Sequence, residues 1–255
     1  MAKKLGISSK SREQLSQLLR NTSGTLSTSE AADILGVDSA TAAKLLSRWS
    51  KRGWLHRVKR GLYIPVPLES SSIEPPIEDP WLVINRLYSP CYIGGWSAAE
   101  HWDLTEQIFR SIQVMTTSSV RQRELTIADV SLRIKTISSY RMFGTKNIWR
   151  GDVKVKVSEP TKVVVDMLDD PKVGGGIRPT LDILQNYFDS EYLDTKLLIE
   201  YSEKMRNKTI FKRLGFLVEK LDFSNDALIS ECKKRLSKGY SKLDPDLPSD
   251  KIVKR

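Results

Sequence analysis

The stretch LSTSEAADILGVDSATAAKLLSRWSKRGWLHRVKRGLYI, residues 26–64, decides the fold expected for the N-terminal part of the chain. It opens with Ser27-Thr28-Ser29-Glu30, a capping-box pattern in which the serine and glutamate side chains accept hydrogen bonds from each other's backbone N–H groups. The helix that begins there should end at Gly36, because glycine adopts the left-handed conformation at little cost. Asp38 is a good N-cap for a second helix that reaches about Arg52.

This second helix has an apolar face and a polar face. Its apolar residues recur at i, i+3, i+4 and i+7 and should face the core: Ala42, Leu45, Leu46 and Trp49. The polar residues are short near the start of the helix and cationic after it: Ser39, Thr41, Lys44, Arg48 and Lys51. This order is typical of a recognition helix, whose first turns enter the major groove while its cations meet phosphates. An ordinary surface helix with a polar face is the alternative interpretation.

A basic hairpin comes after the second helix and favours the recognition-helix interpretation. Gly53 should end the helix, residues 54–58 alternate like a strand, and Lys59-Arg60-Gly61 forms a basic turn before the chain returns. Two helices on a tight turn with such a hairpin after them predict a winged helix-turn-helix, whose wing contacts the DNA backbone. Ser39, Thr41 and Lys44 are the predicted base contacts. The full set of predicted DNA-binding residues is Ser39, Thr41, Lys44, Arg48, Lys51, Arg52, Arg57, Lys59 and Arg60.

The positive charge of the chain is concentrated in the same module. The 255 residues carry a net charge of +10. Residues 1–65 contain twelve Lys and Arg against four acidic residues, a net charge of +8, which leaves 29 basic and 27 acidic residues in the rest. A positive field confined to one small module is what binding to DNA phosphates requires. A solvated basic face without a partner is the alternative.

Composition excludes several other classes of protein. No apolar run approaches the roughly 20 residues that a membrane-spanning helix needs, and the first ten residues lack the apolar core of a signal peptide, so we expect a cytoplasmic protein. Cys91 and Cys232 lie far apart in the sequence and are predicted to be buried free thiols. With only His56 and His101 as histidines, no metal ligand, cofactor or catalytic residue is predicted.

The remaining chain predicts a linker, a second domain and a tail. Residues 67–79 are rich in proline, serine and acidic residues and should connect the winged helix of residues 1–66 to the second domain. Residues 80–240 have strand-like runs first and helical patterns after residue 160, which predicts a larger mixed α+β domain with a helical C-terminal part. Residues 241–255 are expected to form a tail.

Two fragments of the second domain suggest enzymes. Gly95-Trp96-Ser97-Ala98-Ala99 resembles a nucleophile elbow, but Ser97 is more simply explained as a helix N-cap with Glu100 at the third position. Asp152-x-Lys154, with Asp129 or Glu124 upstream, matches a loose pattern of Mg²⁺-dependent nucleases. Lys154 also fits a solvated strand face, so the nuclease is kept as an alternative function.

Several stretches resemble the AbiEi family, the antitoxins of bacterial abortive-infection toxin–antitoxin systems. The most specific is Gly94-Gly95-Trp96-Ser97-Ala98. The others are residues 52–55 and 59–63 of the wing, the remainder of 92–105 with Gln107, and residues 158–162, 166–171 and 213–217. Where the family has a Glu-Pro-x-Arg-Thr pattern, this chain reads Pro160-Thr161-Lys162, so no antitoxin residue is assigned there.

The resemblance implies a non-enzymatic, two-domain regulator. Its winged helix binds inverted repeats in the promoter of its own operon, as a monomer or a dimer on double-stranded DNA, and represses transcription. The C-terminal domain counteracts a nucleotidyltransferase-like toxin, and in this type IV arrangement direct toxin binding is not generally assumed. A repressor whose second domain senses a ligand or directs assembly is a further alternative.

Overall fold

The computed structural model describes residues 8–22, 24–66, 77, 79–221 and 225–245. The chain divides into two compact units, which comprise residues 1–89, 124–132 and 149–155, and residues 90–123, 133–148 and 156–255. The predicted linker lies almost wholly outside the described residues, as does the tail beyond residue 245. The predicted domain limits therefore stay predictions.

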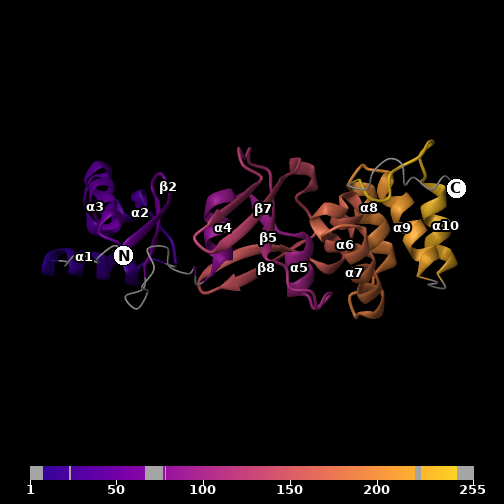
Figure 1. Cartoon of the computed structure of the whole chain (residues 1–255), viewed down its shortest axis with the longest axis horizontal. Helices are drawn as coiled ribbons and strands as arrows, with labels where there is room; N and C mark the ends of the chain where they lie inside the picture. The colour runs from indigo at the N-terminus through magenta and orange to yellow at the C-terminus, as the bar shows by residue number, and fades with distance from the viewer. Residues whose placement is uncertain (1–7, 23, 67–76, 78, 222–224, 246–255) are drawn as a thin grey trace. The chain divides into compact units, whose positions relative to one another are not determined.

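The N-terminal elements form a winged helix-turn-helix (Figure 1). Three antiparallel strands in the order β1-β3-β2 accompany three helices. The elements are α1 (Ser9–Arg20), β1 (Leu26–Ser27), α2 (Thr28–Leu35), α3 (Ser39–Lys51), β2 (Leu55–Lys59) and β3 (Leu62–Pro65). The two helices, the turn and the hairpin are confirmed, whereas the short strand β1 was not predicted.

Local caps set the ends of α2 and α3. Ser27 Oγ accepts from the backbone N–H of Glu30 at 3.2 Å, and the Glu30 carboxylate accepts from the N–H of Ser27 at 2.9 Å, so the predicted capping box is confirmed. Gly36 ends α2 with φ of 62°. Asp38 Oδ1 accepts from the N–H of Thr41 at 2.9 Å and caps α3.

The winged helix has its own apolar core. The apolar face predicted for α3 is confirmed, because Ala42, Leu46 and Trp49 are fully buried and Leu45 packs against them. Leucines from α1 and the sheet, together with Ala31 and Tyr63, complete the cluster: Leu15, Leu18, Leu26 and Leu55. Burial of these apolar side chains stabilises the packing of α3 against the rest of the domain. The polar face of α3 stays exposed to solvent.

The chain then forms a six-stranded mixed sheet with the order β6-β7-β5-β4-β9-β8. Its central strand β4 is buried along its whole length, pairs antiparallel with β5 and pairs parallel with β9 through Ile93 and Val157. The strands are β4 (Cys91–Ile93), β5 (Ser111–Thr116), β6 (Glu124–Ile127), β7 (Val130–Thr136), β8 (Thr145–Arg150) and β9 (Val153–Ser158). The sequence has strand-like runs at residues 91–93, 111–117, 130–138, 146–150 and 154–157, which predict every strand of this sheet except β6.

The helices that follow the last strand, from residue 160 onward, form the helical C-terminal part that the sequence predicts for an α+β fold. The helices beyond the winged helix are α4 (Pro80–Tyr88), α5 (Gly95–His101), η1 (Ser139–Arg141), α6 (Pro160–Asp169), η2 (Pro171–Gly174), α7 (Ile177–Asp189), α8 (Thr195–Lys204), α9 (Thr209–Lys220) and α10 (Asp226–Lys234). Helix α6 is buried from Pro160 to Leu168 because α5, α7, α8 and α9 all pack against it (Figure 1).

The start of α5 corrects the sequence analysis. The N-cap is Gly94, with no side-chain cap, and Gly95 already belongs to the helix with φ of +54°. Ser97 lies inside α5, where its hydroxyl accepts from the backbone N–H of Gln113 at 2.9 Å. The predicted N-cap at Ser97 is wrong, because the chain already enters the helix at Gly95, whose positive φ favours glycine.

Candidate nucleic-acid interface

The polar face of α3 presents a stripe of cations. Lys44, Arg48 and Lys51 are exposed and occur at i, i+4 and i+7, so they share one side of the helix. Thr41 and Arg52 are half-buried beside this stripe. Ser39 is exposed at the first residue of α3, and the helical period places it on another side of the helix.

Thr41 has a local role that the sequence analysis did not anticipate. Its hydroxyl donates to Asp38 Oδ2 at 2.5 Å while its backbone N–H donates to Oδ1. The side-chain and backbone hydrogen bonds from Thr41 lower the pKa of Asp38, so this carboxylate stays ionised at the positive end of α3. In this arrangement the Thr41 hydroxyl uses its hydrogen in the bond to Asp38, so a base contact by Thr41 uses the acceptor lone pairs of the hydroxyl oxygen or the methyl group.

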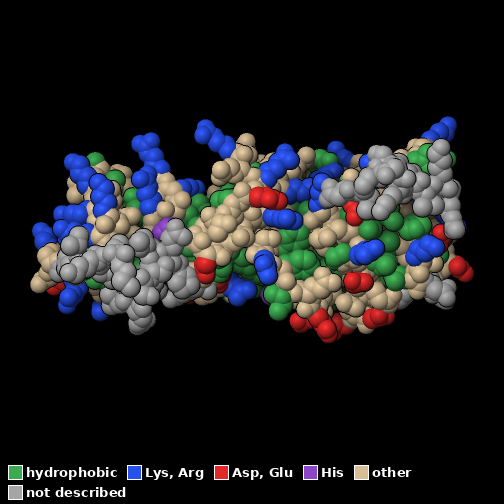
Figure 2. Space-filling model, in the orientation of Figure 1, with side chains coloured by type: hydrophobic (Ala, Val, Ile, Leu, Met, Phe, Trp, Pro, Cys, Tyr) green, Lys and Arg blue, Asp and Glu red, His purple; other side chains and the backbone are tan. Residues whose placement is uncertain are grey.

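The wing carries the other predicted cations. Arg57, Lys59 and Arg60 are exposed, and the Arg57 Nε–H donates to the Lys59 carbonyl at 3.4 Å. Arg57 pairs with Tyr63 and Lys59 with Leu62, so β2 has one more residue than β3 over this interval. Such a bulge redirects a strand near its end. Figure 2 shows Lys and Arg side chains gathered over α3 and β2.

The wing is tied to the helices by backbone contacts. Strand β1 pairs with β3 through Leu26 with Tyr63 and Ser27 with Leu62. The first residue of α2, Thr28, donates its N–H to the Gly61 carbonyl at 3.0 Å. The turn of the wing is thereby fixed to the start of α2.

Residues 13–66 match the model of a family described as "Transcriptional regulator, AbiEi antitoxin". The winged helix is therefore similar to the regulators of this family. This match confirms the resemblance over the winged helix, and all nine predicted DNA-binding residues, from Ser39 to Arg60, fall inside the matched segment. The AbiEi match describes a transcriptional regulator, which is the class of protein that the basic winged helix predicts.

A solved structure extends the likeness in fold to nearly the whole chain. The protein is similar to the RV2827C protein from Mycobacterium tuberculosis, with a TM-score of 0.62 and 15% sequence identity over 94% of this chain and 86% of that chain. At this identity the likeness concerns the fold alone, and it agrees with the predicted α+β class. No curated protein matches the sequence.

The residues of the nuclease alternative are distributed over the sheet. Asp129 lies in the turn between β6 and β7, Asp152 lies in the turn between β8 and β9, and Lys154 is on β9. Strands β5 and β4 separate these two hairpins in the sheet. Within residues 8–22, 24–66, 77, 79–221 and 225–245, no group of three His, Cys, Asp or Glu side chains could hold a metal ion.

Ser97 also lacks the surroundings of a nucleophile. The residue is only 7% exposed, and its hydroxyl oxygen accepts the hydrogen bond from the Gln113 N–H of β5. This contact joins α5 to the sheet.

The C-terminal domain contains a buried polar cluster that the sequence analysis missed. Lys162 on α6 is 0% exposed, pairs with Asp166 one turn later and donates to the Tyr92 hydroxyl at 3.2 Å. The Tyr92 hydroxyl in turn donates to Asp166 Oδ2 at 2.9 Å. Burial, and then the charge of Asp166, raise the pKa of Tyr92 well above its ordinary value. In the sequence, this cluster is indicated only by a lysine and an aspartate that are four residues apart with three valines between them.

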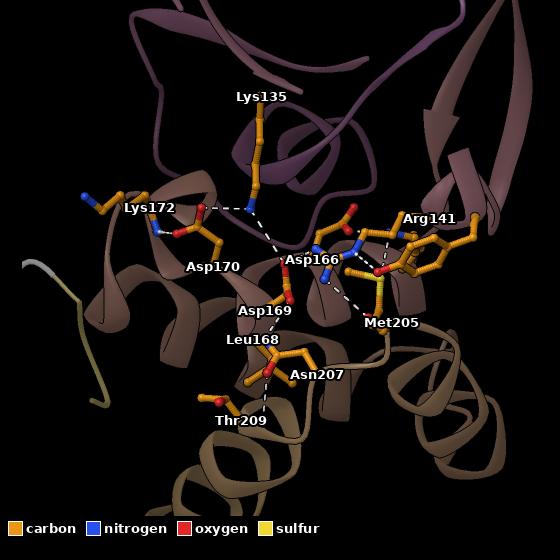
Figure 3. A network of polar contacts seen from close by, with 12 residues as sticks. Lys135, Arg141, Asp166, Leu168, Asp169, Asp170, Lys172, Met205, Asn207 and Thr209 are labelled. Carbon is orange, nitrogen blue, oxygen red and sulfur yellow. Dashed lines mark hydrogen bonds and ion pairs between the residues drawn. The ribbon is translucent and has the colours of Figure 1, made fainter. Parts of the chain in front are cut away.

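A second polar network surrounds the end of α6 (Figure 3). Asp169 accepts from Arg141 Nη1 at 2.8 Å and from Asn207 Nδ2 at 2.8 Å, and Asp170 accepts from Lys135 Nζ at 2.7 Å. Burial raises the pKa of Asp170, but the hydrogen bonds and charges of Lys135 and Lys172 together outweigh burial and leave the pKa lowered. These contacts join β7 and η1 to the helices, so the network holds the sheet and the helical part together.

The two cysteines agree with their prediction. Cys91 and Cys232 are buried free thiols, and burial raises the pKa of Cys232 to about 12. Such thiols are inert to mild oxidants, because the reactive species is the thiolate.

In the part of the chain that the structure describes, none of the helices is long and apolar enough to cross a membrane.

Proposed function

We propose that the protein is a non-enzymatic autorepressor and antitoxin that acts in the cytoplasm. Its winged helix binds inverted repeats in the promoter of its own operon, as a monomer or a dimer on DNA. Its C-terminal domain counteracts a nucleotidyltransferase-like toxin. The observation that carries the proposal is the AbiEi match over residues 13–66, on a module whose exposed helix face and wing are both cationic.

The geometry supports separate tasks for the two cationic elements. In the helix stripe, Arg48 and Lys51 meet phosphates along the major groove, while Lys59 and Arg60 of the wing contact the DNA backbone beside the groove. Arg57 and Arg52 add positive charge to the same surface. Ser39, Thr41 and Lys44 near the helix start remain the proposed base contacts.

Arg48→Ala and Arg60→Ala are expected to weaken binding to the protein's own promoter fragment. Each removes one phosphate contact, so the slope of log K against log salt should become shallower by about 0.9 per variant. Fluorescence anisotropy at several salt concentrations measures both quantities. Arg20→Ala is the matched control, because Arg20 is an exposed arginine on α1 outside the proposed surface. If both variants bind like Arg20→Ala, the assigned surface is wrong.

Repression and antitoxicity should separate genetically. The full chain carrying Arg48→Ala and Arg60→Ala together, expressed from a foreign promoter, is expected to rescue growth against the toxin while it no longer represses its own promoter. A reporter fusion and a growth assay on the same strains give the two readouts. Failure of the wild-type chain to rescue growth would favour a C-terminal domain that senses a ligand or directs assembly.

A further inference from the structure

The tip of the β8–β9 hairpin carries an exposed aromatic side chain next to a cation. Trp149, near the end of β8, is 62% exposed. Lys154 of β9 places its ammonium nitrogen 4.6 Å from the centre of the indole ring. Strand β8 is the edge strand of the sheet, so no further strand of the described chain covers this side of the hairpin.

The hairpin tip is anchored from its other face. The Arg150 guanidinium lies 4.4 Å from the centre of the Trp81 ring, and its Nε is 3.8 Å from Asp79 Oδ2. Because successive side chains of a strand point to opposite faces, an inward Arg150 directs Trp149 outward. The indole is therefore held on an ordered strand before any ligand arrives.

The surroundings of Trp149 are basic. Residues 145–158 contain three lysines and one arginine against a single acid, Asp152, which gives this stretch a net charge of +3. Lys154 is exposed on β9, and it forms no ion pair with a carboxylate of the described residues. An indole face beside an exposed ammonium group suits a ligand that combines flat rings with negative charge.

We propose that this hairpin binds single-stranded nucleic acid. An unpaired base stacks on the open face of Trp149, and Lys154 contacts a neighbouring phosphate. The bases of a duplex are already stacked on one another and offer the indole no free face, so this site differs in its ligand from the winged helix. The proposal does not depend on the DNA sequence that the winged helix reads.

The experiment compares two probes on the full-length chain. Fluorescence anisotropy measures binding of a labelled oligothymidylate of about twelve nucleotides and of the promoter duplex. Trp149→Ala is expected to weaken oligothymidylate binding about tenfold or more, while Trp149→Phe retains most of it. Lys154→Gln should make the salt slope shallower by about 0.7. Duplex binding should stay unchanged in all three variants.

Two controls make the result decisive. Tyr240→Ala removes an aromatic side chain that is 83% exposed elsewhere on the chain, and it should bind the oligothymidylate like wild type. Arg60→Ala should weaken duplex binding alone. The proposal is overturned if the wild-type chain does not bind the oligothymidylate or if Trp149→Ala binds it like wild type. Parallel loss of both probes in Arg60→Ala would place the single strand on the winged helix instead.

Discussion

Alanine in place of Gly95 is expected to lower the free energy of unfolding by about 3 kcal/mol or more, from backbone strain and overpacking together. Gly95 has φ of +54°, and a Cβ there would stand 2.1 Å from the carbonyl oxygen of Val173 and 2.9 Å from the Gln113 side chain. The carbonyl belongs to backbone of η2, which cannot turn aside as a flexible side chain can. Urea unfolding monitored by circular dichroism measures the change.

The Gly151→Ala variant distinguishes the cost of backbone strain from the cost of overpacking. Gly151 has nearly the same φ, +56°, but a Cβ there would meet nothing within 4 Å. This variant is expected to lose only about 1–2 kcal/mol, the cost of a left-handed conformation for alanine. Equal losses in the two variants would show that the approach of Gly95 to η2 does not contribute.

Lys162→Met is expected to destabilise the protein by about 3–5 kcal/mol, although methionine fills a similar volume. The substitution leaves the Asp166 carboxylate buried without its cation and the Tyr92 hydroxyl without one of its two partners. A buried charge without a partner is more costly than the pair is stabilising. Thermal and urea unfolding of the full-length chain give the magnitude.

Replacing the whole cluster should recover most of this loss. In Lys162→Met combined with Asp166→Leu and Tyr92→Phe, no polar side-chain atom of the cluster remains to be satisfied, so the triple variant should be within about 1–2 kcal/mol of wild type. Asp166→Leu alone should be as damaging as Lys162→Met, because it isolates the ammonium group. A triple variant no more stable than the single ones would mean that the cluster contributes net stability.

The winged helix could be predicted from the sequence because its signals are local. The capping box at Ser27, the left-handed Gly36 and the N-cap Asp38 lie within a few residues of the ends they set, and the structure confirms each. The apolar period of α3 likewise needs no knowledge of the rest of the chain. The DNA-binding residues predicted on α3 occupy the opposite, polar face of the same helix.

The features that were missed depend on partners far away in the sequence. Strand β6, with its residues Glu124–Ile127, is short and half polar, and it is a strand because β7 pairs with it. Ser97 has the sequence context of a cap, but its true partner, the N–H of Gln113, is on another element. The i, i+4 spacing of Lys162 and Asp166 is also common on exposed helices, and the burial of Lys162 arises because α5, α7, α8 and α9 enclose its helix.

The backbone pairing of β1 with β3 has a consequence for the kinetics of the proposed binding to DNA. A wing that is a free hairpin becomes ordered only on contact with DNA, and the conformational entropy lost at that moment weakens binding. Here the contact from Thr28 to Gly61 fixes the wing to α2 during folding. In the proposed function, α3 and the wing would therefore meet the duplex as preordered elements, and association could approach the rate set by electrostatic steering.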